Sequence, residues 1–176
     1  MKKKMLFTII LATALTGAVL SQSTGRLVTD RSQIKFFSST PAEDIEAVNT
    51  AAVGTIDMGS GEVVFSVPMQ GFEFEKSLMQ KHFNNDNFLD TKAFPKAKLT
   101  GRIINIDEVD FDSDGKYDAT VEGEMTIKGV TKPFSAKGSL SVEGEKADVS
   151  SVFNITLADY GITFKKVSLQ QISLKR

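Results

Sequence analysis

The sequence predicts an all-β protein, a barrel of eight antiparallel strands with one short helical segment around residues 76–94. Two observations predict it. Polar and apolar residues alternate with a period of two along most of the chain, as they do on strands with one buried face. Short clusters of Gly, Asp, Lys and Pro separate these runs, as tight turns do between neighbouring strands. Closure of such strands into a barrel removes the sheet edges that would otherwise invite aggregation.

The second half of the chain shows the alternation most clearly. Apolar or small residues occupy every odd position from 119 to 127, so Met125 is expected to face inward and Glu124 outward. The same pattern places Phe153 on an inner face and Asn154 on an outer face. We therefore expect a meander of strands at 119–128, 133–142 and 147–157, with turns at 112–115, 128–133 and 143–146.

Five further runs complete the predicted barrel. Within residues 62–74 the apolar positions shift phase after Pro68 and Gly71, so that Phe72 and Phe74 no longer continue the earlier row. This shift predicts a bulge or bend inside one strand rather than a strand end. The five predicted strands are 33–38, 45–58, 62–74, 98–107 and 167–175.

The segment 76–94 does not fit a strand. Met79 and Phe83 have helical spacing, and Ser77 is expected to cap the helix. Asp90 is expected to cap a second short turn. This segment is interpreted as a corner and lid that packs against the barrel.

The chain begins with three lysines at positions 2–4, followed by an apolar run at 5–20 and then small residues. This arrangement is that of a secretory signal peptide. Threonines and a glycine interrupt the run, which is too short and too polar to span a membrane. We expect cleavage near Ser21, which divides the chain into a signal peptide, 1–21, and one domain, 22–176.

Composition restricts the expected cellular location of the protein and the classes of partner that it could bind. The sequence contains no cysteine, so it has no lipoprotein cysteine after the apolar run and no disulfide. A periplasmic or secreted location is expected. Without residues 1–21 the formal charge falls from −1 to −4, which argues against nucleic acid or an anionic membrane as a partner. No later apolar run is long enough to span a membrane.

The predicted inner faces of the meander mix large and small residues. Gly123, Ala136 and Gly138 share these faces with Met125 and Phe134. An eight-stranded barrel either fills its interior with side chains or keeps room for one small ligand, and small inner residues favour the second. Because the inner positions are almost uncharged, the ligand should be apolar. The alternative is that Gly and Ala serve strand crossing and coiling in a dry barrel.

Two segments carry a resemblance to a known family. MQKHFNNDNFLDTKAFPKAKLTGRI, at 79–103, resembles the helix, aromatic–proline pair and strand of YceI-like proteins, which are bacterial secreted lipocalin-like proteins. GEMTIKGVTKPFSAKGSL, at 123–140, is similar to the family's later hairpin with its G-x-T-K-P turn. DYGI at 159–162 and TDRSQIKFFSS at 29–39 resemble its last and first landmarks. The resemblance spans about Leu27 to Leu174.

The resemblance implies an eight-stranded lipocalin-like barrel with an elongated apolar channel that binds polyisoprenoid or other long-chain lipids. Members often carry histidines near the first strand, whereas this chain has Gln33 and the serines of SSTP at 38–41. The departure concerns recognition of a polar head group and not the channel itself.

Two motifs contain residue types that serve in catalysis or in metal binding. His82 is the sole histidine, and it lacks a nearby partner that would orient it as a general base. Asp110, Asp112 and Asp114 have the spacing of a calcium loop, but Val121 stands where the bidentate carboxylate belongs. The sequence leaves open whether this loop ever binds calcium. No catalytic residue, metal site or cofactor is predicted.

The sequence thus predicts a non-catalytic binding protein, secreted or periplasmic, that holds an isoprenoid or other long-chain apolar lipid. The alternative is a dry-barrel structural or interaction module that acts through its surface in stress tolerance. Whether two chains pair as a homodimer is left open. The predicted channel lining is Phe36, Val63, Phe65, Val67, Phe72, Phe83, Phe88, Ile103, Val121, Met125, Phe134, Ala136, Leu140 and Phe153.

Overall fold

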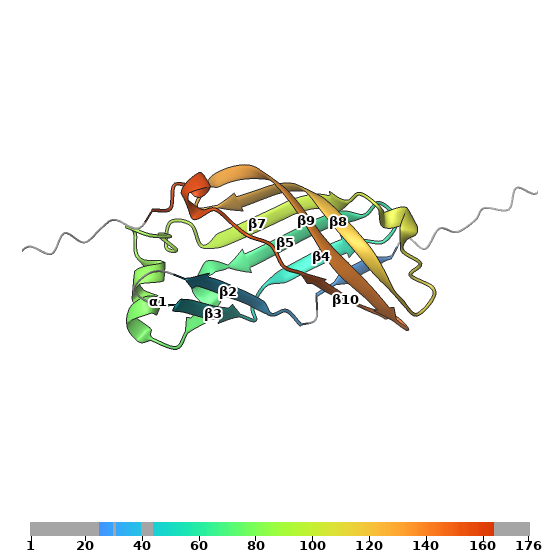
Figure 1. Ribbon diagram of the computed structural model, residues 1–176, viewed down its shortest axis with the longest axis horizontal. Coiled ribbons are helices and arrows are strands. Elements are labelled where there is room, and N and C mark those ends of the chain that lie inside the picture. Colours follow the sequence, from blue (N-terminus) through green and yellow to red (C-terminus); the bar gives the residue numbers. More distant parts are fainter. Residues whose placement is uncertain (1–24, 30, 40–43, 164–176) are drawn as a thin grey trace, which may run out of the picture.

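A computed structural model describes residues 25–29, 31–39 and 44–163 of the 176-residue chain. Within these residues the chain forms a nearly closed antiparallel β-barrel with one short α-helix at one end (Figure 1). The predicted all-β barrel is confirmed, although the described part is built from ten strands. The predicted signal peptide, 1–21, and the predicted last strand, 167–175, lie outside the described residues and stay predictions.

The strands of the described residues form two antiparallel sheets. In chain order the elements are β1 (Arg26–Val28), β2 (Ile34–Ser39), β3 (Asp44–Asn49), β4 (Val53–Asp57), β5 (Glu62–Pro68), η1 (Met69–Gly71), β6 (Phe72–Phe74), α1 (Ser77–Asn84), β7 (Lys96–Ile103), η2 (Ile106–Glu108), β8 (Gly115–Ile127), β9 (Val130–Glu143), β10 (Lys146–Ser151) and η3 (Leu157–Tyr160). The larger sheet has the order β1-β4-β5-β7-β8-β9-β10, and the smaller sheet has the order β2-β3-β6.

The meander predicted for the second half is confirmed in β8, β9 and β10, and β7 precedes it in the same sheet. Met125 is 8% exposed and Glu124 is exposed, as the alternation predicts. The turn predicted at 128–133 shortens to Lys128 and Gly129, whose φ angles are 48° and 76°. A two-residue hairpin turn requires this left-handed backbone because its twist then matches that of the strands.

The first half differs from its prediction, because two predicted strands are each broken. The run 45–58 forms β3 and β4, and the run 62–74 forms β5 and β6, with each pair divided between the two sheets. The phase shift after Pro68 marks the 3-10 turn η1, which carries the chain from one sheet to the other, rather than a bulge. β1 and β2 are divided in the same way. Three neighbouring strands therefore break together and form a corner of the barrel.

A buried asparagine holds this corner. Asn49 is fully buried; its Nδ2 donates to the Pro68 carbonyl at 2.8 Å, and its Oδ1 accepts the Ala51 N–H at 2.8 Å. Close by, the Ser32 hydroxyl donates to the Ala52 carbonyl at 2.7 Å. Buried backbone groups need partners, and these side chains supply bonds that a sheet ladder no longer provides where the chain turns. The long predicted strands break for this reason.

β10 is shorter than the predicted strand 147–157. It ends at Ser151, and residues 152–156 continue without regular structure. The Ser151 hydroxyl donates to the Lys137 carbonyl at 2.7 Å, on the edge of β9 that a longer β10 would have paired with. The side chain thus takes an acceptor that the ladder would need to continue.

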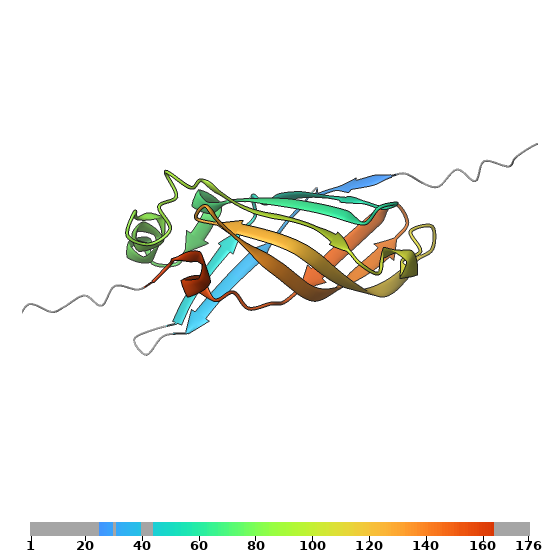
Figure 2. The ribbon, with the colours of Figure 1, turned by 90° about the horizontal axis from the view of Figure 1, so that it is seen from above.

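The helix α1 covers one end of the barrel (Figure 2). Lys76 holds the N-cap position without a capping side chain, so the predicted Ser77 cap is wrong. Tertiary contacts hold the helix instead. The Gln80 amide donates to the Phe72 carbonyl at 2.6 Å, and its oxygen accepts the Phe74 N–H at 3.2 Å. This amide therefore bonds to the free edge of β6 as another strand would.

Aromatic packing fixes the same lid. The ring of Phe83 lies 5.4 Å from that of Phe72, 4.9 Å from Phe74 and 6.3 Å from Phe88, measured between centroids. Asp90 closes the predicted second turn, since its carbonyl accepts the N–H of residue 94 at 2.8 Å. The corner-and-lid interpretation of this segment agrees with these contacts.

Buried apolar side chains form two clusters, one toward each end of the barrel. The lid cluster lies at the end of the barrel that α1 covers, and it includes Tyr160, whose hydroxyl pKa is raised by burial. The lid cluster comprises Ala47, Met69, Phe72, Phe83, Leu89, Met125, Ile127, Tyr160 and Ile162, and the far cluster comprises Ile56, Val63, Ile103, Ile106, Val109, Ala119, Leu140 and Val142.

Candidate ligand-binding interior

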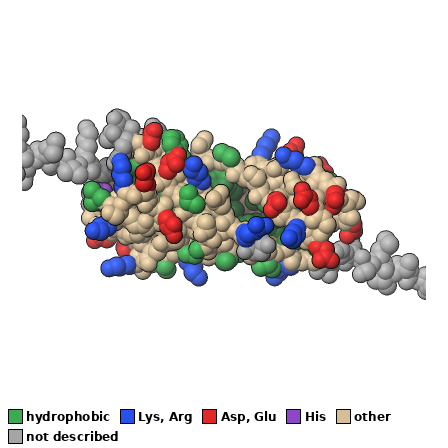
Figure 3. Space-filling model, turned by 90° about the horizontal axis from the view of Figure 1, so that it is seen from below, with side chains coloured by type: hydrophobic (Ala, Val, Ile, Leu, Met, Phe, Trp, Pro, Cys, Tyr) green, Lys and Arg blue, Asp and Glu red, His purple; other side chains and the backbone are tan. Residues whose placement is uncertain are grey.

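Several inner residues that lie between the two buried clusters are only half-buried. On β9 the inner row runs from Phe134 through Ala136 to Leu140; Leu140 is 0% exposed, whereas the other two are half-buried. Phe65 of β5 and Val121 of β8 are also half-buried inner residues. A close-packed barrel would bury its central side chains most completely, so this pattern indicates a hollow. Figure 3 shows such a hollow on one face, with hydrophobic side chains on its floor.

The inner row next to β9 is exposed along β10. Val149 pairs directly with Leu140, yet Val149 is 47% exposed. Phe153 is 43% exposed and packs edge-on against Phe134, with the ring centroids 4.9 Å apart. Large apolar side chains on the inner side of a barrel are therefore open to solvent here. An extended apolar ligand would remove this surface from water.

The glycines on the inner faces allow neighbouring strands to approach closely, whereas the sequence predicted that they leave volume for a ligand. Gly101 of β7 and Gly123 of β8 pair directly. A Cβ on Gly123 would run into the Thr100 carbonyl and the Gly101 backbone, and a Cβ on Gly138 would meet the Ser150 carbonyl. These glycines are thus required for close approach of neighbouring strands, as the dry-barrel alternative holds. Ala136 already carries a Cβ and is therefore not required for close approach of the strands. Its small size can instead leave volume in the interior.

The fourteen predicted lining residues fall into three groups. Six are buried, seven are half-buried, and Phe153 is exposed outside any strand. Their role in ligand binding stays a prediction. The buried group is Val63, Phe72, Phe83, Ile103, Met125 and Leu140, and the half-buried group is Phe36, Phe65, Val67, Phe88, Val121, Phe134 and Ala136.

Several inner residues are absent from the predicted channel lining, although the alternation places Val149 on the inner face. Ile34, Phe74 and Leu99 pack against the lid cluster, and Val149 extends the exposed inner row. The alternation itself could have identified Leu99, which pairs with Met125. The alternation could not identify Tyr160, because it lies on the short turn η3 rather than on a strand.

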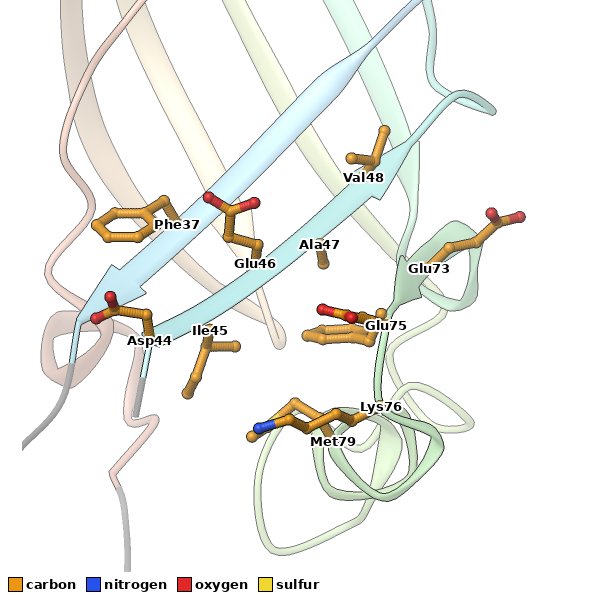
Figure 4. Close-up of a pocket in the computed structure, with 11 residues that line it drawn as sticks. Phe37, Asp44, Ile45, Glu46, Ala47, Val48, Glu73, Glu75, Lys76 and Met79 are labelled. Carbon is orange, nitrogen blue, oxygen red and sulfur yellow. The ribbon is translucent and has the colours of Figure 1, made fainter. Parts of the chain in front are cut away.

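A second concavity of about 420 Å³ lies where α1 meets β3 and the end of β6 (Figure 4). In Figure 4, Ile45 and Ala47 point toward α1, while Glu46 points to the other side of β3. Its apolar lining is Phe37, Ile45, Ala47, Val48, Phe74 and Met79, and its charged lining is Asp44, Glu46, Glu73, Glu75 and Lys76. Four acids against one base make its border acidic.

His82 and Asp110 line neither of these concavities, whereas Asp114 lines a separate one of about 520 Å³ beside Gly144. His82 is exposed on α1. Hydrogen bonds from the Ser113 hydroxyl and the Asp112 N–H lower the pKa of Asp110, and the Asp114 carboxylate accepts the Gly144 N–H at 2.8 Å. In the part of the chain that the structure describes, no group of three His, Cys, Asp or Glu side chains could hold a metal ion. The described helices include none long and apolar enough to cross a membrane.

Comparisons with known proteins agree with this architecture. A solved polyisoprenoid-binding domain from Saccharophagus degradans, implicated in plant cell wall breakdown, superposes with a TM-score of 0.61 at 13% identity; the match covers 79% of this chain and 78% of that one. At this identity the likeness supports the fold alone.

Curated sequence relatives match about half of the chain. A UPF0312 protein of Pseudomonas putida (strain W619) is 31% identical over 100 residues, 53% of this chain and 48% of the relative. A UPF0312 protein of Pseudomonas savastanoi pv. phaseolicola is 31% identical over 88 residues, 47% of this chain and 42% of the relative. The chain thus spans about half the length of the curated relatives that it matches. The family model of the YceI-like domain matches residues 26–175. The chain therefore belongs to the YceI-like domain family.

Proposed function

We propose that this protein is a non-catalytic binding protein, periplasmic or secreted, that holds an isoprenoid or similar long-chain apolar lipid inside its barrel. The observation that carries the proposal is the half-exposed apolar centre of the interior, between two buried clusters. Membership of the YceI-like family and the likeness to a polyisoprenoid-binding domain support it. The signal-peptide pattern at 1–21 supports the location.

Burial of apolar surface is sufficient to account for the affinity of such binding without a cofactor. Burial of apolar surface contributes on the order of 25 cal/mol per Å², and a flexible isoprenoid chain would cover Phe65, Phe134 and Phe153 together. Aromatic walls with few polar groups are typical of sites for apolar ligands. The expected complex is thus driven by removal of apolar surface from water on both partners.

A dry-barrel module that acts through its surface is the second candidate. The specific observation in its favour is the close approach at Gly101 and Gly123, which explains both glycines without a cavity. It leaves the exposure of Val149 and Phe153 without a role. The two candidates differ in whether lipid accompanies the protein.

Native mass spectrometry of the protein purified from its own host tests the proposal. We expect a fraction of the protein to carry extra mass, and solvent extraction to release a long-chain apolar lipid of that mass. Fractionation of the host and N-terminal sequencing of the exported form test the location. Protein without bound lipid, together with failure to take up any added long-chain lipid, would favour the dry barrel.

A matched pair of variants locates the site. Ala136→Phe places a ring in the half-buried centre, whereas Ser135→Phe places the same ring on the exposed outer row of β9. If the centre is hollow, the first variant should lose most bound lipid with little change in stability, and the second should keep it. In a dry barrel, Ala136→Phe would overpack the interior at a cost of about 1–3 kcal/mol.

A further inference from the structure

One charged residue occupies an inner-row position in the ten described strands. Lys132 of β9 pairs directly with Met125 of β8, which is buried. Its neighbours in the same row are Val130 and Phe134, and both pack against the lid cluster. Side chains two residues apart on a strand share a face, so Lys132 belongs to the interior side of the barrel.

Lys132 is nonetheless exposed, and its side chain forms no ion pair or hydrogen bond with any residue that the structure describes. Among the described strands none pairs with β9 on this side beyond residue 138, because β10 pairs only with residues 138–143, and the short turn η3 lies against β9 instead. Next to Lys132 in the inner row, Phe134 packs edge-on with the exposed Phe153. A lysine in this place can lay its apolar stem along the wall and keep its ammonium in water.

The acidic concavity at the lid has the opposite electrostatic character. Asp44, Glu73 and Glu75 border it, and the fourth acid, Glu46, is paired with Lys35 at 3.4 Å. An anionic group would be repelled there. The ammonium of Lys132, which has no partner among the described residues, therefore offers the favourable position for an anion along the apolar interior.

We propose that Lys132 binds the anionic head group of the lipid, a phosphate or a carboxylate, while the apolar tail lies along Phe134 and Phe153 toward the centre of the barrel. This inference rests on the proposed function and narrows its ligand class to anionic long-chain lipids. It also assigns head-group recognition to β9. A charged residue on the inner side of an edge strand can also serve only to prevent strand pairing between molecules, and that role would leave lipid affinity unchanged.

Three probes with one tail separate these roles. Geranylgeraniol, geranylgeranyl monophosphate and geranylgeranoic acid are titrated into the delipidated protein, into Lys132→Gln and into Lys137→Gln. Lys137 lies on the exposed outer row of the same strand, so its variant matches the charge change. A charge-assisted hydrogen bond is worth about 1.5–3 kcal/mol, and the low end of that range is roughly tenfold in affinity.

The expected result is that the two anions bind roughly tenfold more tightly than the alcohol, and that Lys132→Gln alone removes this difference. Lys132→Arg should restore it. The ratio between phosphate and carboxylate then identifies the head group. Equal affinity for all three probes, unchanged in Lys132→Gln, would overturn the role of Lys132 and leave the lipid-binding function standing. Absence of binding by all three would overturn both proposals.

Discussion

The two halves of the barrel differ in whether their strands are continuous. From β7 to β10 each strand pairs with the next, and the alternation of the sequence describes the register directly. From β1 to β6 the chain shows a similar alternation but divides each long run between two sheets. The comparison teaches that a period of two identifies the face of each residue, but it does not tell whether a strand is continuous.

The difference arises from backbone hydrogen bonds and not from side-chain hydrophobicity. A strand can break without changing its inner row if polar side chains satisfy the backbone groups at the break. In the first half Asn49 does this from a fully buried position. In the second half Asn105 bonds the Asp118 carbonyl and the Thr120 N–H, both at 2.9 Å, and closes a connection between two continuous strands.

Substitution of the two asparagines tests this difference most directly. Asn49→Ala removes both hydrogen bonds of a fully buried side chain, so that the Pro68 carbonyl and the Ala51 N–H lose their partner. We expect a loss of about 2–4 kcal/mol in the free energy of unfolding, since each lost hydrogen bond costs about 0.5–1.5 kcal/mol and the truncated side chain leaves a buried cavity. Asn105→Ala should cost only about 1 kcal/mol because water can reach its half-buried site. Equal losses in urea unfolding would show that the corner has no special role.

Glycine substitution tests the continuous half. In Gly123→Ala the new Cβ meets the backbone of β7, which cannot move aside as a side chain could. We expect a loss of about 1–3 kcal/mol, as for overpacking elsewhere. Gly59→Ala is the control, since its Cβ would lie 3.6 Å from the nearest heavy atom, on Asp57. A stable Gly123→Ala protein would mean that β7 and β8 can separate at this point.

The lid joins the two halves, and Gln80 is its polar contact with the smaller sheet. Gln80→Ala removes two hydrogen bonds to β6, and we expect a loss of about 1 kcal/mol in unfolding free energy. Local opening should increase more than global unfolding, which hydrogen exchange of α1 and β6 amides would detect. Lys81→Ala, on the exposed side of the same helix, is the control. Identical exchange in both variants would argue that aromatic packing alone holds the lid.

The smallest effect is expected for the sole histidine. His82 is exposed, and we assign its ring no acid–base or metal role. His82→Ala should therefore change the free energy of unfolding by no more than about 0.5 kcal/mol and leave lipid retention unchanged. A variant with unaltered stability that lost lipid or another measured activity would reveal a site that this interpretation omits.

Much of the candidate interior could be predicted from the sequence, because inner and outer rows follow from alternation once each run is recognised. Thirteen of the fourteen predicted lining residues are buried or half-buried. The exception, Phe153, illustrates the limit. Its place in the alternating pattern was interpreted as that of an inward-facing strand residue. However, β10 ends at Ser151, whose hydroxyl donates a hydrogen bond to the Lys137 carbonyl.

By itself, then, the sequence determined the all-β class, the register of the meander and the nearly uncharged inner rows. All three depend on local properties: period, turn residues and side-chain polarity. Only the tertiary structure decided where the long runs break, which end α1 covers, and that inner residues between the two buried clusters are only half-buried. These features depend on partners far along the chain, such as Pro68 for Asn49 and Ala52 for Ser32, and no local pattern encodes which distant backbone group a side chain will meet.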